Sequence, residues 1–162
     1  MARTLWGFRF NLGGSLKKIH ARYFARSTEL PEEIGRDELL GRGIFDSRKA
    51  RQAQRGRVPP GVFRERTGIR ELSVDRLSFG HHEQISEIHN AERAGQQFHG
   101  WATVLVANAE GNGREVVARP ILPSNPYHAE IVLPDMEGLD ADEEQEAHAL
   151  SLAMLSTWLA GP

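Results

Sequence analysis

The stretch HGWATVLVANAEGNGREVVARPIL, residues 99 to 122, carries the clearest secondary-structure signal in the chain. Two runs rich in β-branched and aromatic residues flank EGNGRE, and such residues favour strands. The dipeptide Asn112-Gly113 between the runs is a strong signal for a hairpin turn. We therefore predict a β-hairpin around Asn112-Gly113, with three residues of the first run partly inside the core: Trp101, Val104 and Val106.

Further strands and helices are predicted on both sides of this stretch. IRELSVDRLSF, residues 69–79, and HAEIVLP, residues 128–134, have the length and composition of strands. Residues 81–97 repeat apolar side chains at helical spacing, so we predict a helix there that begins near His81 and His82. In residues 69–79 we expect Ser73 and Asp75 on the solvent face.

The C-terminal stretch DADEEQEAHALSLAMLSTWLAG, residues 140–161, predicts one amphipathic helix. Its first turns are acidic, which suits the positive end of a helix dipole, and Gly161 suits a C-cap. Apolar residues at helical spacing form a stripe that we expect to pack on the sheet: Ala147, Leu150, Met154 and Trp158.

The first third of the chain is less regular. Residues 1–14 alternate like a strand, Ser15 can cap a helix over residues 15–26, and Asp37 precedes a short predicted helix with Leu39 and Leu40. Ser47 to Gln54 is interpreted as a solvated helix or a mobile loop, within a basic segment at residues 42–61. The whole chain, residues 1–162, is thus predicted to be a single α+β domain with a mainly antiparallel sheet.

Composition excludes several classes of protein. The chain has 162 residues, 40% of them hydrophobic and 26% charged, which is typical of a globular domain. It has no cysteine, which excludes disulfides and thiolate zinc sites. No apolar stretch approaches the about 20 residues of a membrane helix, and no signal peptide is evident. We expect a soluble, cytoplasmic protein with no membrane partner.

Charge is divided unevenly along the chain. Residues 1–70 hold sixteen Lys and Arg against seven acids, whereas residues 71–162 hold four against fifteen. Two interpretations stay open. The charges can neutralise one another within one molecule or between copies, or the basic half can present a patch to an anion such as nucleic acid.

A nucleic-acid contact would use the cations of two segments. SRKARQAQRGR, residues 47–57, has no aromatic residue to stack on a base, so its contacts would be to phosphates. GGSLKK, residues 13–18, puts two lysines at the start of a predicted helix, where anions bind. The predicted nucleic-acid-binding residues are Arg48, Lys49, Arg51, Arg55, Arg57, Lys17 and Lys18.

The tripeptide His128-Ala129-Glu130 resembles half of a zinc deaminase motif, but the cysteines that complete the motif are absent. No two histidines have a recognised metal-ligand spacing, so we predict no metal and no cofactor. In a strand His128 and Glu130 share one face, and with His99 and Arg42 they could cleave RNA by moving protons and holding charge. These four are the candidate catalytic residues of a small, toxin-like, RNA-directed enzyme.

The order Arg42, Ser73, Glu130 is similar to the Arg, Ser and Glu that ADP-ribosyltransferases use, over three separate residues and no contiguous motif. It leaves a nucleotide-transferring enzyme as a further hypothesis. Because no complete catalytic motif is present, we expect first an accessory or interaction protein, whose basic N-terminal half contacts nucleic acid or a partner subunit. Its partners would be copies of itself or another protein, and whether it is an enzyme stays undecided at this point.

Overall fold

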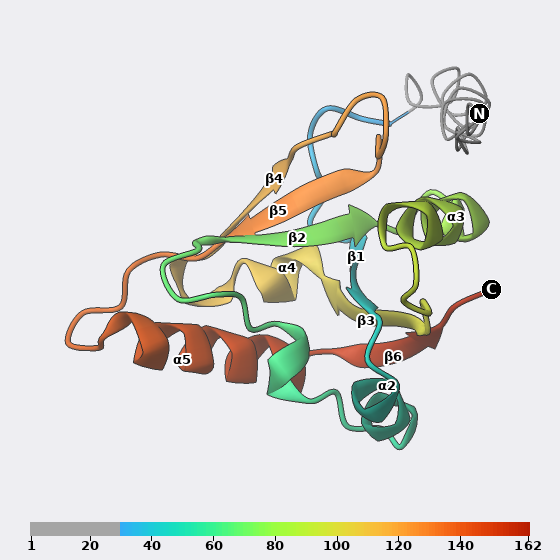
Figure 1. Cartoon of the computed structure of the whole chain (residues 1–162). Coiled ribbons are helices and arrows are strands. Elements are labelled where there is room, and N and C mark those ends of the chain that lie inside the picture. Colours follow the sequence, from blue (N-terminus) through green and yellow to red (C-terminus); the bar gives the residue numbers. More distant parts are fainter. Residues whose placement is uncertain (1–29) are drawn as a thin grey trace, which may run out of the picture.

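The structure, a computed structural model, describes residues 30–162. The strand and helix predicted over residues 1–26, together with Lys17 and Lys18, lie outside the described residues. The remaining chain forms six strands in one antiparallel sheet, in the order β4-β5-β2-β1-β3-β6 (Figure 1). The strands are β1 Leu39–Ile44, β2 Glu71–Arg76, β3 Gly100–Leu105, β4 Glu115–Ala118, β5 His128–Val132 and β6 Thr157–Ala160.

Four α-helices and two 3-10 turns connect the strands. The helices are α2 Ser47–Gln54, α3 His82–Glu92, α4 Val106–Ala109 and α5 Ala141–Met154, and the turns are η1 Pro60–Val62 and η2 Gly111–Gly113. This arrangement confirms the predicted α+β domain with an antiparallel sheet and a C-terminal helix. Among residues 30–162, no helix has the length and apolar character that crossing a membrane requires.

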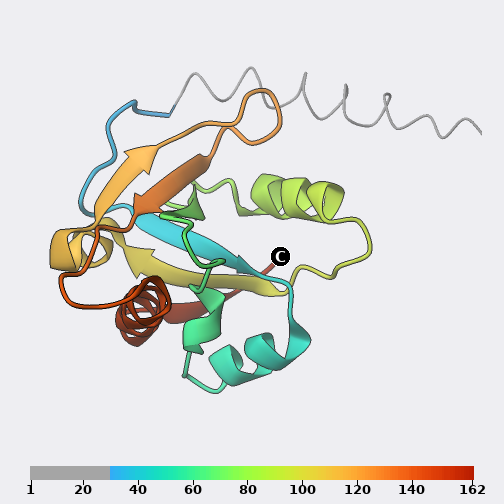
Figure 2. The same ribbon diagram turned by 60° about the vertical axis from the view of Figure 1, so that its left-hand side comes forward.

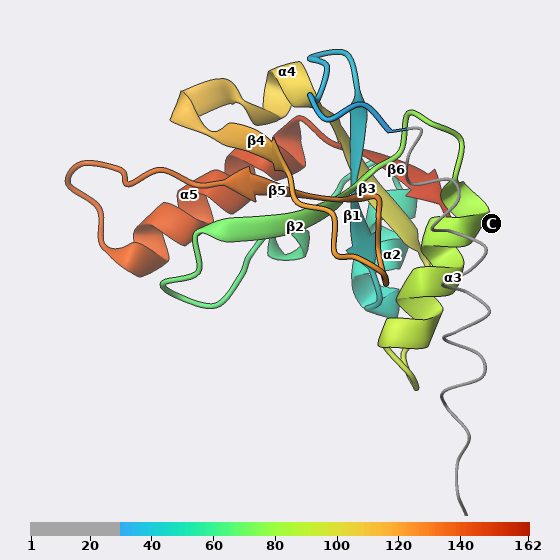
Figure 3. The same cartoon turned by 90° about the horizontal axis from the view of Figure 1, so that it is seen from above.

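The sheet separates two apolar cores. On one face α2 and α5 pack against residues such as Leu40, Leu72 and Ala102. On the other face α3 packs through Ile85 and Ile88 against a cluster around Trp101. Figure 2 shows α2 and α3 on opposite sides of the sheet, and Figure 3 shows α3 at the end away from the start of α5. On the sheet face that α3 covers, no helix from residues 30–162 lies over the part formed by β2 and β5 (Figure 2 and Figure 3).

The pairing between β1 and β2 is much shorter than the other ladders. β1 pairs with β3 over six residue pairs and β2 pairs with β5 over five, but β1 and β2 pair only at Leu40–Arg76 and Gly41–Asp75. Beyond Gly41 the two strands part. The sheet therefore consists of two three-stranded halves, β4-β5-β2 and β1-β3-β6, which meet along a short seam.

Side-chain caps fix the starts of α2 and α5. The Asp46 carboxylate accepts hydrogen bonds from the backbone N–H groups of Arg48 and Lys49, at 2.8 and 3.0 Å. At α5, Asp140 and Glu143 form a reciprocal capping box. Ser47–Gln54 is thus a helix, one of the two alternatives left by the sequence, and its Ala50 and Ala53 are buried in the core.

The predicted hairpin around Asn112-Gly113 is wrong. Both residues do turn the chain with positive φ, 61° at Asn112 and 76° at Gly113. However, β3 already has β1 and β6 on its two sides, so it has no free edge for β4. Val106–Ala109 forms α4 instead and carries the chain to the other end of the sheet, where β4 pairs with β5. The core prediction for Trp101, Val104 and Val106 is confirmed, since all three are buried.

The predicted C-terminal helix is confirmed in its first two thirds and wrong beyond. It ends at Met154, and Thr157–Ala160 forms β6, which pairs with β3. The Ser156 hydroxyl bonds to the Leu152 carbonyl at 2.6 Å, and the Thr157 hydroxyl lies 2.9 Å from that of Thr103. The predicted stripe is also wrong, because Leu150 and Met154 are exposed and Trp158 lies on β6. The buried face is Glu144, Gln145, His148, Ala149, Leu152 and Ala153.

The short helix predicted at Leu39 and Leu40 is wrong as well, because these residues begin β1. Gly41 lies in that strand opposite Asp75, and a side chain there would approach Leu77 and Trp101 to 2.5 and 2.7 Å. Glycine is a poor helix former, and here it admits the Trp101 ring against the strand. The strand is therefore selected by tertiary packing.

Candidate active site

A cleft opens where β1 and β2 part, and the Arg42 side chain spans it. Arg42 Nη1 donates to the Ser73 carbonyl at 2.8 Å, which replaces the missing ladder between the strands. Its Nε donates to the Val62 carbonyl at 3.3 Å, and its Nη2 forms an ion pair with Glu65. A guanidinium has five N–H donors, so two remain for a ligand. Arg42 is thereby held rigidly at the centre of the cleft.

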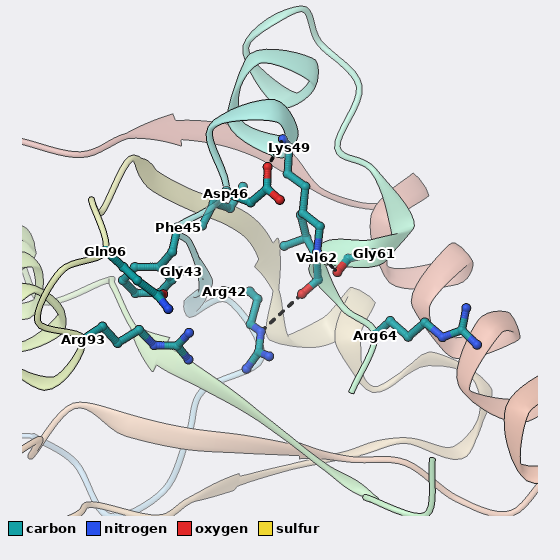
Figure 4. A pocket seen from close by; sticks show the side chains of 11 residues that line it. Arg42, Gly43, Phe45, Asp46, Lys49, Gly61, Val62, Arg64, Arg93 and Gln96 are labelled. Carbon is teal, nitrogen blue, oxygen red and sulfur yellow. Dashed lines mark hydrogen bonds between the residues drawn. The ribbon is translucent and has the colours of Figure 1, made fainter. Parts of the chain in front are cut away.

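On one side of Arg42 lies a cavity of about 410 Å³, which we call the basic compartment. Its charged lining residues are Arg42, Lys49, Arg64, Arg93 and Asp46. Figure 4 shows Arg42 and Arg93 pointing toward one another, whereas Arg64 turns toward α5, where it pairs with Glu146. Arg42 is already paired with Glu65, but no carboxylate within residues 30–162 forms an ion pair with Arg93 or Lys49. The compartment therefore favours an anionic ligand.

An aromatic contact and a hydrogen bond hold two cations of the basic compartment in place. The Arg93 guanidinium carbon lies 4.3 Å from the centre of the Phe45 ring. Lys49 Nζ donates to the Gly61 carbonyl at 2.7 Å. The pKa of Asp46 lies below its ordinary value of 3.8, chiefly because the backbone N–H groups of Lys49 and Arg48 bond to its carboxylate. The one carboxylate that lines the compartment is thus already engaged as a helix cap.

On the other side of Arg42 lies a smaller cavity of about 140 Å³, the Asp75 compartment. It shares four lining residues with the basic compartment, so the two adjoin: Arg42, Gly43, Phe45 and Arg93. Its other charged or polar lining residues are Ser73, Asp75, His89, Glu92, Asn125 and His128. β1, β2, β5, the end of α3 and the loop before β5 all contribute to it.

A buried carboxylate organises this compartment. Asp75 Oδ2 accepts hydrogen bonds from His89 Nε2 at 2.6 Å and from Trp101 Nε1 at 3.3 Å. Asp75 Oδ1 accepts one from Asn125 Nδ2 at 3.2 Å. The Asp75 side chain is only 3% exposed. A buried carboxylate needs hydrogen-bond donors in place of water, and these three donors supply them. Asp75 therefore fixes groups from three different elements: α3, β3 and the loop before β5.

Packing orients the His89 ring beside the carboxylate. The ring stacks on Phe98 with centroids 5.1 Å apart and meets Phe45 edge-on at 5.4 Å. Gly43 leaves the space for it, since a side chain there would lie 3.3 Å from His89 Nε2. With Nε2 bonded to Asp75, Nδ1 is the ring nitrogen that can exchange a proton. His89 is thus oriented as histidines are in acid–base sites.

The predicted catalytic residues are brought together in part. Arg42 lies at the centre of the cleft. His128 is the cross-strand neighbour of Asp75, and its Nδ1 lies 2.7 Å from the Arg119 carbonyl. Glu130 is the cross-strand neighbour of Ser73 and lies 3.6 Å from Arg119. The structure does not place His99 with them.

His99 lies just before β3. Its backbone bonds to Ile44 and Gly161, and it does not line either compartment. The three residues Arg42, Ser73 and Glu130, by contrast, lie on the neighbouring strands β1, β2 and β5.

The predicted nucleic-acid-binding residues in the described chain lie on α2 and just after it. Lys49 lines the basic compartment, while Arg48, Arg51, Arg55 and Arg57 are exposed. No carboxylate within residues 30–162 forms an ion pair with any of these five side chains.

Asp75, His89, Arg93 and Asn125 were missed from the sequence. Ser73 is exposed as predicted, but the prediction that Asp75 faces solvent is wrong, because α3 and the Trp101 ring cover it. An acidic residue in an apolar strand is the signal that could have indicated a buried site. His89 has no such signal, since its partner lies 14 residues earlier on another element.

Within the described part of the chain, no group of three or more His, Asp or Glu side chains could hold a metal ion. No protein-family model, curated protein or solved structure matches the chain. The functional argument therefore depends on the geometry of the cleft.

Proposed function

We propose that this protein is an enzyme that binds a nucleotide in the cleft and transfers a nucleotide-derived group to an acceptor. The observation that carries the proposal is the opening between β1 and β2, where Arg42 bonds to Ser73 and faces Arg93. Arginine pairs readily with phosphate, and a cavity of about 410 Å³ falls in the usual range for small-molecule sites.

Residues in the cleft and on the neighbouring strand β5 have distinct roles in the proposed reaction. The phosphates of a dinucleotide such as NAD would lie between Arg42 and Arg93. This position of the phosphates would hold the sugar against β2. Glu130 lines neither compartment, but it is the cross-strand neighbour of Ser73, which lines the Asp75 compartment. Its side chain is partly exposed, so it can meet a substrate that extends from the cleft. A carboxylate there stabilises positive charge that develops on a ribose carbon.

The reaction balances without a further reagent. The bond between the ribose C1′ and the nicotinamide nitrogen breaks, and neutral nicotinamide leaves with the bonding electrons. A hydroxyl or amine of the acceptor forms the new bond to C1′ and loses a proton to Glu130. Asp75, two residues after Ser73 on β2, keeps the loop before β5 in place through its hydrogen bond with Asn125.

Calorimetry and one matched pair of variants test the proposal. We expect NAD or ADP-ribose to bind with a dissociation constant in the usual range of Michaelis constants, about 1 µM to 1 mM. Glu130→Gln should keep this affinity and lose about 100-fold or more in the rate of nicotinamide release. Glu71→Gln is the control, because Glu71 is exposed on the same face of β2, two residues before Ser73. Absence of binding to both ligands would overturn the proposal.

The RNA-cleaving hypothesis with His128, Glu130 and His99 has less support. Acid–base cleavage requires two proton-transferring groups at one bond. His128 lines the Asp75 compartment and shares β5 with Glu130, but His99 lies just before β3, which β1 and β2 separate from β5. An interaction with nucleic acid is nevertheless supported by a different surface.

A further inference from the structure

Exposed arginines lie on α2 and in the turn directly after it, and we call them the α2 basic face: Arg48, Arg51, Arg55 and Arg57. Arg48, Arg51 and Arg55 follow one another at i, i+3 and i+7, so they lie along one side of the helix. The opposite side is anchored in the core by Ala50 and Ala53. The helix is therefore held firmly while its cations extend into solvent.

These arginines differ from most others in the described chain. Six arginines form ion pairs with carboxylates: Arg36, Arg42, Arg64, Arg70, Arg76 and Arg119. Those of the α2 basic face have no such partner within residues 30–162. α2 itself contains no acid, and its cap Asp46 is occupied by backbone N–H groups. Four positive charges, on α2 and in the turn that follows it, thus remain without an acidic partner in the described chain.

The α2 basic face continues into the cleft. Lys49, on the same helix, lines the basic compartment. At the other end of α2, Arg55 and Arg57 line a second hollow of about 390 Å³ with Gln52, Pro59 and Pro60. An eight-residue helix is about 12 Å long, so a bound strand could run along it and reach the cleft.

We propose that the α2 basic face binds the phosphate backbone of a single-stranded nucleic acid, and that this strand is the acceptor in the proposed transfer reaction. Regularly spaced phosphates complement regularly spaced arginines. Residues 47–57 contain no aromatic side chain, so contacts are to the backbone and carry no base sequence. A single strand is favoured over a duplex because a duplex holds its nucleotides in the stack, away from a cavity of this size. The acceptor role rests on the proposed function, whereas the binding does not.

Binding is tested with the full chain and a fluorescein-labelled 15-nucleotide oligouridylate. Each phosphate contact contributes about 0.7 to the slope of log affinity against log salt concentration for a single strand. Arg51→Gln with Arg55→Gln should therefore lower the slope by about 1.4 and weaken binding about 25-fold at 0.1 M salt. The control is Arg36→Gln with Arg66→Gln, which removes the same charge from two other exposed arginines. Fluorescence anisotropy at several salt concentrations measures both.

Several results would overturn the binding proposal. They are an equal loss in the two double variants, affinity without salt dependence, or tighter binding to a duplex of the same length. A further outcome is that the chain does not bind the oligonucleotide but associates with itself. If both salt and the Arg51→Gln, Arg55→Gln change abolish that self-association, the surface binds a second copy of the chain instead.

The acceptor role is tested separately by mass spectrometry. With NAD present, the oligouridylate should gain the mass of one ADP-ribosyl group with the wild-type chain and not with Glu130→Gln. If NAD is not bound but the oligouridylate binds through α2, the proposed function fails and the α2 inference on binding stands. If both bind and the strand gains no mass, the acceptor role is wrong.

Discussion

At the scale of single residues, Asp75 explains why the cleft has a fixed shape. Its carboxylate is the shared acceptor for His89, Trp101 and Asn125, and each of these donors belongs to a different element. Sequence could indicate Asp75 only as an acid within a strand. It could not indicate the three donors, because hydrogen bonds over separations of 14 to 50 residues depend on the fold.

Removal of the Asp75 carboxylate should therefore destabilise the whole chain. Asp75→Ala leaves three buried donors without an acceptor, and we expect the free energy of unfolding to fall by about 3 kcal/mol or more. Urea denaturation followed by tryptophan fluorescence measures it. Asp37→Ala is the control, since Asp37 is exposed. Equal stability of the two variants would contradict a structural role for Asp75.

At the scale of elements, sequence prediction failed where strand pairing in the sheet decides the structure. Ser47–Gln54 forms α2, but from the sequence a solvated helix and a mobile loop both stayed open, because Ala50 and Ala53 are the only apolar residues of this segment. The hairpin failed because Asn112-Gly113 specifies a turn but not which strands the turn joins. α5 failed at its end because helical spacing continues into Thr157 and Trp158, which pair with β3. Local sequence signals thus predicted the presence of helices and strands better than they predicted which strands pair with one another.

The cap of α2 predicts a pH dependence. The pKa of Asp46 is lowered in the folded chain, so its carboxylate stabilises the fold above its ordinary pKa of 3.8 and loses that effect as the pH falls through the lower, folded-state value. We expect Asp46→Ala to be less stable than wild type at pH 6, with the difference shrinking below pH 4. Urea unfolding at both pH values tests this. A difference that is constant with pH would show that the carboxylate charge plays no part.

The edge strand β6 predicts the effect of one glycine substitution. Gly100 has φ of 140°, and an added Cβ would lie 2.3 Å from the Leu159 carbonyl oxygen. Gly100→Ala should therefore displace β6 and cost about 2 kcal/mol or more. Gly56→Ala is the matched control, because Gly56 also has positive φ but nothing within 4 Å, and it should cost about 1 kcal/mol. Hydrogen exchange of residues 157–160 should increase only in the first variant.

At the scale of the whole molecule, the uneven charge of the sequence is resolved only in part by the fold. Arg64 and Arg70 of the basic half pair with carboxylates near the start of α5, whereas the α2 basic face has no acidic partner in the described chain. Sequence composition indicated the imbalance. It could not indicate which cations would be neutralised, because that depends on which surfaces the fold brings together.

A ligand that touches both halves of the sheet should stabilise the whole fold. At 100 times its dissociation constant, a ligand that binds only the folded state adds about 2.7 kcal/mol. We expect NAD to raise the melting temperature in a concentration-dependent way, and Arg93→Gln to reduce the rise. Arg66→Gln should behave as wild type, since Arg66 lies outside both compartments. An unchanged melting temperature at saturating NAD would contradict binding across the cleft.

The seam between the two halves of the sheet has a consequence for how the chain can be divided. The backbone crosses from one half to the other between β1 and β2, β2 and β3, β3 and β4, and β5 and β6. Neither trio of strands is therefore a continuous piece of polypeptide, and no single cut can release one as an independent fragment. The two trios are therefore joined four times by the backbone and form one interwoven unit.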